Sequence, residues 1–434
     1  MLREAVNVGV IGFGTVGSGT VRVLLENGDV LRRRLGFELR LRRVADKDTE
    51  RDRGVRLPAG LLAADAAAVL DDPEIDIVVE LVGGLRPAKD FILRAIENGK
   101  HVVTANKALL AEEGSDIFSA AEARGVRVGF EASVAGGIPI IKVIREGLVA
   151  NRILSVYGII NGTANYIMTR MTDEGSEFAD ALGEAQRLGY AEADPTFDVE
   201  GIDAAHKLTI LASLAYGIPL SYGQVYTEGI TKITPLDIAF AGELGYKIKL
   251  LAIAKAADGE VELRVHPTML PADHLISKVD GVFNAVHVEG DAVGETLYYG
   301  RGAGDMPTAS AVVSDLADIA LDIAGGAVRP QRMVPGGGGL AIRKMADVES
   351  MYYFRFTAMD RPGVLSKISG ILGDNNISIA SVIQKGRRIG GAVPLVILAH
   401  RARERDITRA VGEIDKLPVV ADRSFYIRVE GKEE

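Results

Sequence analysis

Six carboxylates and one lysine are concentrated between residues 184 and 207. They are Glu184, Glu192, Asp194, Asp198, Glu200, Asp203 and Lys207. Apolar residues recur with helical spacing from Ile202 onward, so Asp203 and Lys207, four residues apart, are expected on one face of a helix. The carboxylate would keep the ammonium group charged and oriented, and that group could donate a proton to a carbonyl oxygen that gains negative charge. An ordinary exposed ion pair is the alternative.

A glycine-rich turn near the N-terminus predicts a nucleotide site. Its residues, which lie between an alternating apolar strand and a helix, are Gly12, Phe13, Gly14, Thr15, Val16 and Gly17. In that context the glycines permit a tight turn and let backbone N–H groups approach a pyrophosphate. A second strand over 38–45 ends at Asp46 and Lys47. The acid favours NAD, whereas Lys47 and two nearby arginines would accommodate the phosphate of NADP, so the choice leans slightly to NADP and both cofactors stay open.

Two later segments are expected at the same site. A strand over 101–105 is followed by Lys107, and ligands of open α/β sheets bind beyond the carboxyl ends of parallel strands. A second glycine-rich loop from Tyr299 to Asp305, with Gly302 and Gly304, precedes a helix near 308–325. That helix is expected to return to the nucleotide domain and close the cofactor cleft. A surface lysine and a plain turn are the respective alternatives.

Composition narrows the class of protein. The chain has 434 residues, which is too long for one core, so two or three domains are expected. The net charge of −9 argues against a nucleic-acid or anionic-membrane partner. No cysteine is present, which excludes disulfides, thiolate zinc sites and aldehyde oxidation through a thioester. An enzyme that handles an aldehyde would therefore use hydride transfer. No signal segment or membrane span is recognised, and a cytoplasmic protein is expected.

The segment from Ala185 to Lys207 resembles the signature of homoserine dehydrogenases, A-x-x-x-G-Y-x-E-x-D-P-x-x-D-V-x-G-x-D-x-x-x-K, without a gap. The resemblance implies the reversible NAD(P)H-dependent reduction of L-aspartate 4-semialdehyde to L-homoserine, in threonine, methionine and isoleucine biosynthesis. It implies that Lys207 is the proton donor, that Lys107 is a second lysine at the nicotinamide and substrate, and that Asp203 positions Lys207. The implied substrate ligands are Glu192, Asp198, Gly162, Thr163 and Tyr190.

Two further segments resemble known sites. The loop over 129–139 resembles the family's site for a sodium or other monovalent cation, with the carboxylate of Glu131 and the carbonyls of Val134, Gly136 and Ile138 as ligands. The C-terminal βαββαβ pattern resembles an ACT domain, which implies an amino-acid effector such as L-threonine. Its implied contacts are Asp360, Gly363, Val364, Leu365, Asn376 and Ile377. A domain kept for assembly alone is the alternative.

The predicted architecture is α/β with three domains. A Rossmann-type dinucleotide-binding domain over 1–130, joined by the helix near 308–325, precedes a mixed α+β domain for catalysis and dimerisation over 131–330. A linker over 331–349 leads to a ferredoxin-like (ACT) domain over 350–432. A homodimer or homotetramer is expected, and removal of the residues after Gly339 is expected to leave activity intact. The alternatives are another amino-acid or hydroxy-acid dehydrogenase and a non-catalytic amino-acid sensor.

Overall fold

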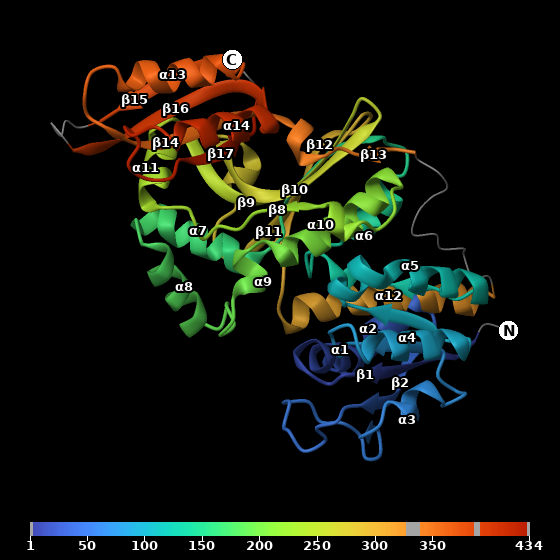
Figure 1. Ribbon diagram of the computed structural model, residues 1–434. Helices are drawn as coiled ribbons and strands as arrows, with labels where there is room; N and C mark the ends of the chain where they lie inside the picture. Colours follow the sequence, from blue (N-terminus) through green and yellow to red (C-terminus); the bar gives the residue numbers. More distant parts are fainter. Residues whose placement is uncertain (1–2, 327–338, 386–390, 432–434) are drawn as a thin grey trace. The chain divides into compact units, whose positions relative to one another are not determined.

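Two compact units make up the chain. The computed structural model describes residues 3–326, 339–385 and 391–431 (Figure 1). The first unit contains Met1–Gly162, Asp203–Val225 and Val282–Leu340, and the second contains Thr163–Ile202, Tyr226–Gly281 and Ala341–Glu434. The domain boundaries stay predictions, and residues 331–338 of the predicted linker lie outside the described residues. In the described part of the chain, no helix combines the length and the apolar character needed to cross a membrane.

A six-stranded parallel sheet forms the N-terminal part of the first unit. Its strands follow the order β3-β2-β1-β4-β5-β6, and each neighbouring pair is parallel. Their bounds are β1 Ala5–Ile11, β2 Glu38–Ala45, β3 Leu62–Ala63, β4 Ile77–Glu80, β5 His101–Thr104 and β6 Val128–Gly129. Val6, Val8 and Val10 of β1 are fully buried, as expected for a strand covered on both faces. The predicted Rossmann-type sheet is confirmed, and it brings the carboxyl ends of its strands to one edge.

Helices from both ends of the first unit's sequence cover this sheet. The early ones are α1 Thr15–Glu26, α2 Gly28–Leu35, α3 Ala67–Leu70, α4 Ala88–Glu97 and α5 Lys107–Arg124. The late helix α12, Asp305–Gly325, lies against α1 (Figure 1). The approach is close because Gly19 has no side chain: a Cβ atom there would stand 2.7 Å from the carbonyl oxygen of Asp305. Val312 and Leu316 of α12 share the hydrophobic core of β1 and α1, so this late helix packs with the elements of the parallel sheet.

An antiparallel sheet and helix α10 complete the first unit. Strand β11, Phe283–Gly290, pairs with β7, Ile153–Ile159, and with β12, Gly294–Arg301. The glycine-rich loop predicted from Tyr299 begins only after Arg301, because strand pairing continues to Phe283 opposite Arg301 and the ring of Phe283 stacks on Tyr299. The remaining elements are η1 Glu131–Ser133, α6 Ile140–Lys142, η2 Val143–Gly147, α10 Ile202–Tyr216 and η3 Tyr222–Gln224.

One mixed sheet forms the frame of the second unit. Its strands follow the order β9-β10-β17-β14-β16-β15. Their bounds are β9 Tyr246–Ala257, β10 Glu260–Pro271, β14 Glu349–Met359, β15 Ile379–Gln384, β16 Ala392–Arg403 and β17 Phe425–Val429. The last four strands, with α13 Val364–Asp374 and α14 Glu404–Ile414, form the predicted βαββαβ domain, whose core includes Phe354, Ile368 and Ile407. Strand β17 also pairs in parallel with β10, so this domain continues the preceding sheet.

The described end of the predicted linker is structured as well. Strand β13, Ala341–Ile342, pairs with β10, and Arg343 forms ion pairs with Glu260 at 2.8 Å and Glu262 at 3.3 Å. The other elements of the second unit are α7 Gly162–Glu174, α8 Phe178–Arg187, α9 Thr196–Val199, β8 Tyr226–Thr227, α11 Pro235–Glu243, η4 Leu275–Lys278 and η5 Met345–Asp347. The fold class is α/β with a C-terminal ferredoxin-like domain, as predicted.

Candidate active site

Two lysines converge on one carboxylate in the first unit. Asp203 and Lys207 lie one turn apart on α10, and Lys107 is the first residue of α5. Nζ of Lys207 is 2.7 Å from Oδ2 of Asp203, and Nζ of Lys107 is 3.1 Å from Oδ1. Asp203 and Lys207 are buried, whereas Lys107 is partly exposed. The predicted pairing on one helical face is confirmed, and the lysine that follows β5 joins it.

The surroundings of Asp203 favour its charged form. Nδ2 of Asn161 donates to Oδ2 of Asp203 at 2.8 Å, and Lys207 donates to the carbonyl oxygen of Ile160 at 2.7 Å. Burial by itself would raise the pKa of Asp203, but the ammonium groups of Lys207 and Lys107 and the hydrogen bonds from Lys207 and Asn161 outweigh it and hold the pKa below its ordinary value. A fixed anion thus orients two ammonium groups, which suits proton donation to an oxygen that gains negative charge.

Sequence analysis missed two residues that organise this cluster. Asn161 is one of them, and its position directly before the predicted ligand Gly162 was the available signal. Glu80 is the other; it is fully buried at the end of β4, where Oε2 accepts the hydroxyl of Thr104 at 2.8 Å. Burial raises the pKa of Glu80. The hydroxyl oxygen of Thr104 in turn accepts a hydrogen bond from the N–H of Asn106, whose side chain caps α5. Glu80 therefore supports the end of the helix that carries Lys107.

The first glycine-rich turn has the geometry of a dinucleotide loop. Gly12 has a φ of +95°, and a Cβ atom on Gly17 would stand 2.0 Å from the carbonyl oxygen of Gly12, so neither position tolerates a side chain. Gly14 precedes α1 without a side-chain cap, and a Cβ atom there would meet no atom within 4 Å. The N–H groups in the first turn of a helix have no intrahelical acceptor. The turn, including Phe13, Thr15 and Val16, therefore fits a pyrophosphate.

Asp46 is engaged with the same turn. Its Oδ2 accepts the N–H of Phe13 at 2.6 Å, and its Oδ1 lies 3.3 Å from the guanidinium group of Arg53. Arg53 also lies over the ring of Phe13, and Lys47 is exposed beside this pair. An acid at the end of the second strand can bind the ribose of NAD, whereas basic groups can bind the extra phosphate of NADP. The geometry is compatible with either dinucleotide.

Packing accounts for the glycines of the later loop. A Cβ atom on Gly302 would stand 2.0 Å from the side-chain amide of Asn284, and one on Gly136 would stand 2.4 Å from the carbonyl oxygen of Gly302. Gly304 has a φ of +119° and directly precedes α12. Gly302 and Gly304 are thus required by the conformation and packing of the loop itself. A contact of Gly302 or Gly304 with the dinucleotide stays a prediction.

Two carboxylates of the acidic segment have structural partners within the second unit. Glu184 forms an ion pair with Arg170 at 2.7 Å. Asp194 accepts hydrogen bonds from the backbone N–H and the hydroxyl of Thr196, the first residue of α9. These contacts stabilise the local fold of the segment. They account for both carboxylates without a bound ligand.

The predicted substrate ligands of the second unit lie around the same segment. Glu192 is exposed and Asp198 is half-buried. Tyr190 is exposed, and its carbonyl oxygen accepts the hydroxyl of Thr163 at 2.6 Å. The proximity of these groups to Lys207 stays a prediction, as do their roles and that of Gly162.

The predicted cation loop contains a buried carboxylate. Oε1 of Glu131 accepts the N–H of Ile141 at 2.8 Å, and Oε2 accepts the N–H of Lys142 at 2.9 Å. Burial and then the neighbouring carboxylate of Asp315 raise the pKa of Glu131 to about 7. Both carboxylate oxygens therefore face backbone donors. Binding of a cation by Glu131 with the carbonyls of Val134, Gly136 and Ile138 stays a prediction.

A cavity of about 560 Å³ lies at the D-R-P-G turn of the C-terminal domain. Its lining includes the predicted effector contacts Asp360, Gly363, Val364 and Leu365. Gly363 has a φ of +85° and precedes α13 without a side-chain cap, so the cavity presents a helix N-terminus beside a carboxylate. The other two predicted contacts differ: Ile377 packs in the core of the domain, and Asn376 adopts a φ of +58° beside it.

Comparison with known families covers most of the chain. Residues 12–131 match the model for the homoserine dehydrogenase NAD-binding domain, residues 139–317 match the homoserine dehydrogenase model, and residues 352–419 match the ACT domain model. The first two matches contain the glycine-rich turn and the cluster of Asp203 with its two lysines. The third contains the cavity at the D-R-P-G turn.

Individual relatives agree with these matches. A homoserine dehydrogenase of Pseudomonas aeruginosa is 50% identical over 98% of this chain and 99% of its own length. The crystal structure of a homoserine dehydrogenase from Thiobacillus denitrificans is 52% identical, covers 98% of both chains and has a TM-score of 0.91. A hyperthermophilic archaeal homoserine dehydrogenase solved in complex with NADPH is 27% identical, covers 73% of this chain and 98% of its own, and has a TM-score of 0.63. The chain belongs to the homoserine dehydrogenase family, as an NAD(P)-dependent oxidoreductase that carries a C-terminal ACT domain.

Proposed function

We propose that Lys207 donates a proton to the carbonyl oxygen of L-aspartate 4-semialdehyde as the aldehyde is reduced to L-homoserine. The observation that carries this role is the shared carboxylate: Asp203 lies 2.7 Å from the Nζ of Lys207 and 3.1 Å from that of Lys107. The carboxylate keeps Lys207 in its donating form and orients it, while Lys107, partly exposed at the carboxyl end of β5, stabilises the developing negative charge. In the reverse direction Lys207 takes the proton back.

The remaining roles follow from the chemistry of the substrate and the cofactor. Glu192 and Asp198 bind the substrate ammonium group, because carboxylates are the natural partners of such a cation. Gly162, Thr163 and Tyr190 complete the substrate site. A bound dinucleotide would supply the hydride for the carbonyl carbon, and the turn from Gly12 to Gly17 would hold its pyrophosphate. We prefer NADP to NAD, since Lys47 and Arg53 accompany Asp46, and the archaeal relative binds NADPH.

Substitution of Lys207 tests the assignment. Lys207→Ala is expected to lower turnover by several orders of magnitude, because the proton donor is lost. Dinucleotide affinity is expected to stay nearly unchanged, because the turn from Gly12 to Gly17 is not altered. Lys100→Ala is the matched control. Lys100, directly before β5, is also a buried lysine of the first unit, and it donates a hydrogen bond to the carbonyl oxygen of Ile75. Steady-state kinetics with homoserine and each dinucleotide measures both effects. Near-normal turnover in Lys207→Ala would remove the proposed role.

The regulatory and assembly proposals rest on the C-terminal domain. An amino acid, L-threonine in the first place, occupies the cavity at the D-R-P-G turn, with its carboxylate at the N-terminus of α13 and its ammonium group near Asp360. The product would feed threonine, methionine and isoleucine biosynthesis in the cytoplasm. A homodimer or homotetramer and a monovalent cation at the loop of Glu131 complete the proposal.

A further inference from the structure

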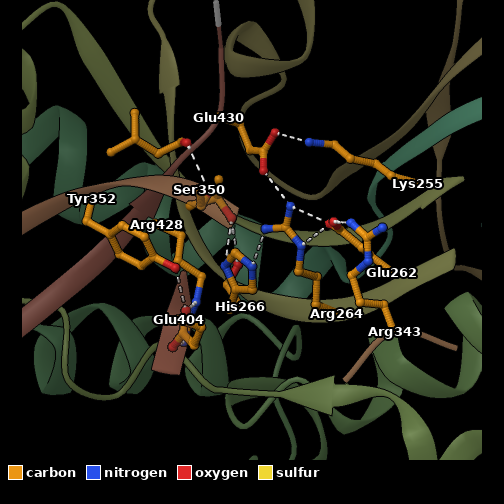
Figure 2. A network of polar contacts seen from close by, with 12 residues as sticks. Lys255, Glu262, Arg264, His266, Arg343, Ser350, Tyr352, Glu404, Arg428 and Glu430 are labelled. Atoms are coloured by element: carbon orange, nitrogen blue, oxygen red, sulfur yellow. Dashed lines mark hydrogen bonds and ion pairs between the residues drawn. The ribbon is translucent and has the colours of Figure 1, made fainter. Parts of the chain in front are cut away.

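A network of buried charges joins the ACT domain to the strand beside it. Arg264 of β10 and Arg428 of β17 are each 1% exposed, and their strands are parallel neighbours (Figure 2). Arg264 donates to Glu430 at 2.6 Å, and Nε of Arg428 donates to Glu404 at 2.9 Å. Buried charges are costly unless they are paired and hydrogen-bonded. The network therefore holds these two strands in a fixed position relative to each other.

His266 is a neutral member of this network of buried charges. Its Nε2 lies 3.0 Å from a guanidinium nitrogen of Arg264 (Figure 2). Its Nδ1 lies 2.9 Å from the carbonyl oxygen of Pro267. Because arginine can only donate, Nε2 accepts and Nδ1 carries the proton. Burial and then the charges of Arg428 and Arg264 hold the pKa of His266 well below its ordinary value. The imidazole is neutral, and the arginines stay directed at carboxylates.

Arg428 reaches beyond the ACT domain on its other side. Its Nη1 donates to Glu228 at 2.8 Å, and its Nη2 donates to the hydroxyl of Tyr226 at 3.0 Å. The same hydroxyl donates to Glu228 at 3.0 Å, and the guanidinium group lies over the ring of Tyr226 at 4.8 Å. One arginine thus holds Glu404, at the start of α14, and Glu228, directly after β8, in a single cluster.

The segment that starts at Glu228 lies against α9, the one-turn helix that carries Asp198. The N–H of Ile230 donates to the carbonyl oxygen of Val199 at 2.8 Å. A Cβ atom on Gly229 would stand 2.4 Å from that oxygen, so the two backbones are in direct contact. Val199 is the residue after Asp198. Any displacement of Glu228 is therefore transmitted to α9 through backbone atoms, without a flexible side chain in between.

We infer that Glu228, held by Arg428 of the ACT domain, is a positioning residue for α9, the one-turn helix that carries Asp198. This inference rests on the proposed role of Asp198 as a ligand of the substrate ammonium group. Helix α9 keeps its position because Glu228 is held from the ACT side by a buried guanidinium group. The ACT domain thereby contributes to substrate affinity even when no effector is bound, and a change in this domain reaches the substrate through the same contacts.

Glu228→Ala in the full-length enzyme tests the inference. The KM for homoserine is expected to rise about tenfold, at the lower end of ordinary coupling between sites, with kcat and the dinucleotide KM unchanged. Glu228→Gln keeps an acceptor for Arg428 and is expected to restore most of the affinity. If Glu228 acts through Asp198, the KM of the double variant with Asp198→Ala equals that of Asp198→Ala alone.

Arg355→Met is the matched control. Arg355 of β14 forms an ion pair at 2.6 Å with Asp237 of α11, so it too joins the ACT domain to the rest of the second unit, but its ion pair does not involve the Glu228 segment. It is expected to lower the unfolding temperature and leave the homoserine KM unchanged. An unchanged KM in Glu228→Ala, or an equal rise in Arg355→Met, would overturn the positioning role. An unchanged KM in Asp198→Ala would instead remove the proposed ligand, and the positioning role with it.

Discussion

Asp203→Asn tests whether one carboxylate orients both lysines. The substitution keeps the size of the side chain and removes the charge that the ammonium groups of Lys207 and Lys107 face at 2.7 and 3.1 Å. A hydrogen bond to a charged group contributes roughly 1.5–3 kcal/mol, so the two weakened bonds amount to about 3–6 kcal/mol. Since about 1.4 kcal/mol corresponds to a tenfold change in rate, kcat is expected to fall by roughly 10²- to 10⁴-fold. That is the range which a general acid ordinarily contributes.

Steady-state oxidation of homoserine, followed by the absorbance of the reduced nicotinamide, measures kcat and both KM values. The dinucleotide KM should stay unchanged, because the glycine-rich turn belongs to β1 and α1. Asp322→Asn is the matched control: Asp322 is a buried carboxylate of the same unit, on α12, and forms an ion pair with Arg127. A kcat close to that of the unsubstituted enzyme, or a loss no larger than in the control, would refute the reasoning.

Two further predictions concern regulation and pH. Leu365→Arg should abolish inhibition by L-threonine, because Leu365 lines the cavity and a guanidinium group would fill it. The inhibition is measured against the uninhibited rate of the same variant. Inhibition that persists would exclude this cavity as the effector site. Burial and then Asp315 raise the pKa of Glu131 to about 7, and burial raises the pKa of Asp315 to about 6. The folded state therefore holds protons that the unfolded state releases. The free energy of unfolding should fall as pH rises from about 4 to 7. Glu131→Gln should remove roughly 3 kcal/mol of that fall in urea unfolding at pH 5 and 8, whereas an unchanged pH dependence would contradict the assignment.

The structure argues against one expectation about the ACT domain. A linker that separates an independent module predicts that removal of the residues after Gly339 leaves activity intact. Instead, β17 pairs with β10, and the buried Arg264 takes one of its carboxylates, Glu430, from the end of the domain. A truncated chain would leave Arg264 without that partner and would expose the edge of β10, and both changes are destabilising. We therefore expect the truncated protein to lose stability as well as regulation.

Local spacing in the sequence was sufficient for several features of the site. The pairing of Asp203 with Lys207 depends only on helical geometry, because residues four apart lie on one face. The glycine-rich turn is also local, since its glycines are required by a close approach within six residues. The alternating or continuous apolar runs predicted the parallel sheet and the βαββαβ domain, because burial of one or both strand faces leaves a clear pattern.

Tertiary structure decided which distant groups meet, since no periodicity in the chain encodes a partner. The sequence by itself determined the family signature, the dinucleotide turn and the type of each domain. Only the folded chain brought Lys107 to Asp203, directed both oxygens of Glu131 to backbone N–H groups, and joined Arg428 to Glu228, 200 positions apart. Each of these contacts depends on how sheets and helices pack. Burial then strengthens the interaction between the paired groups, because water screens them less.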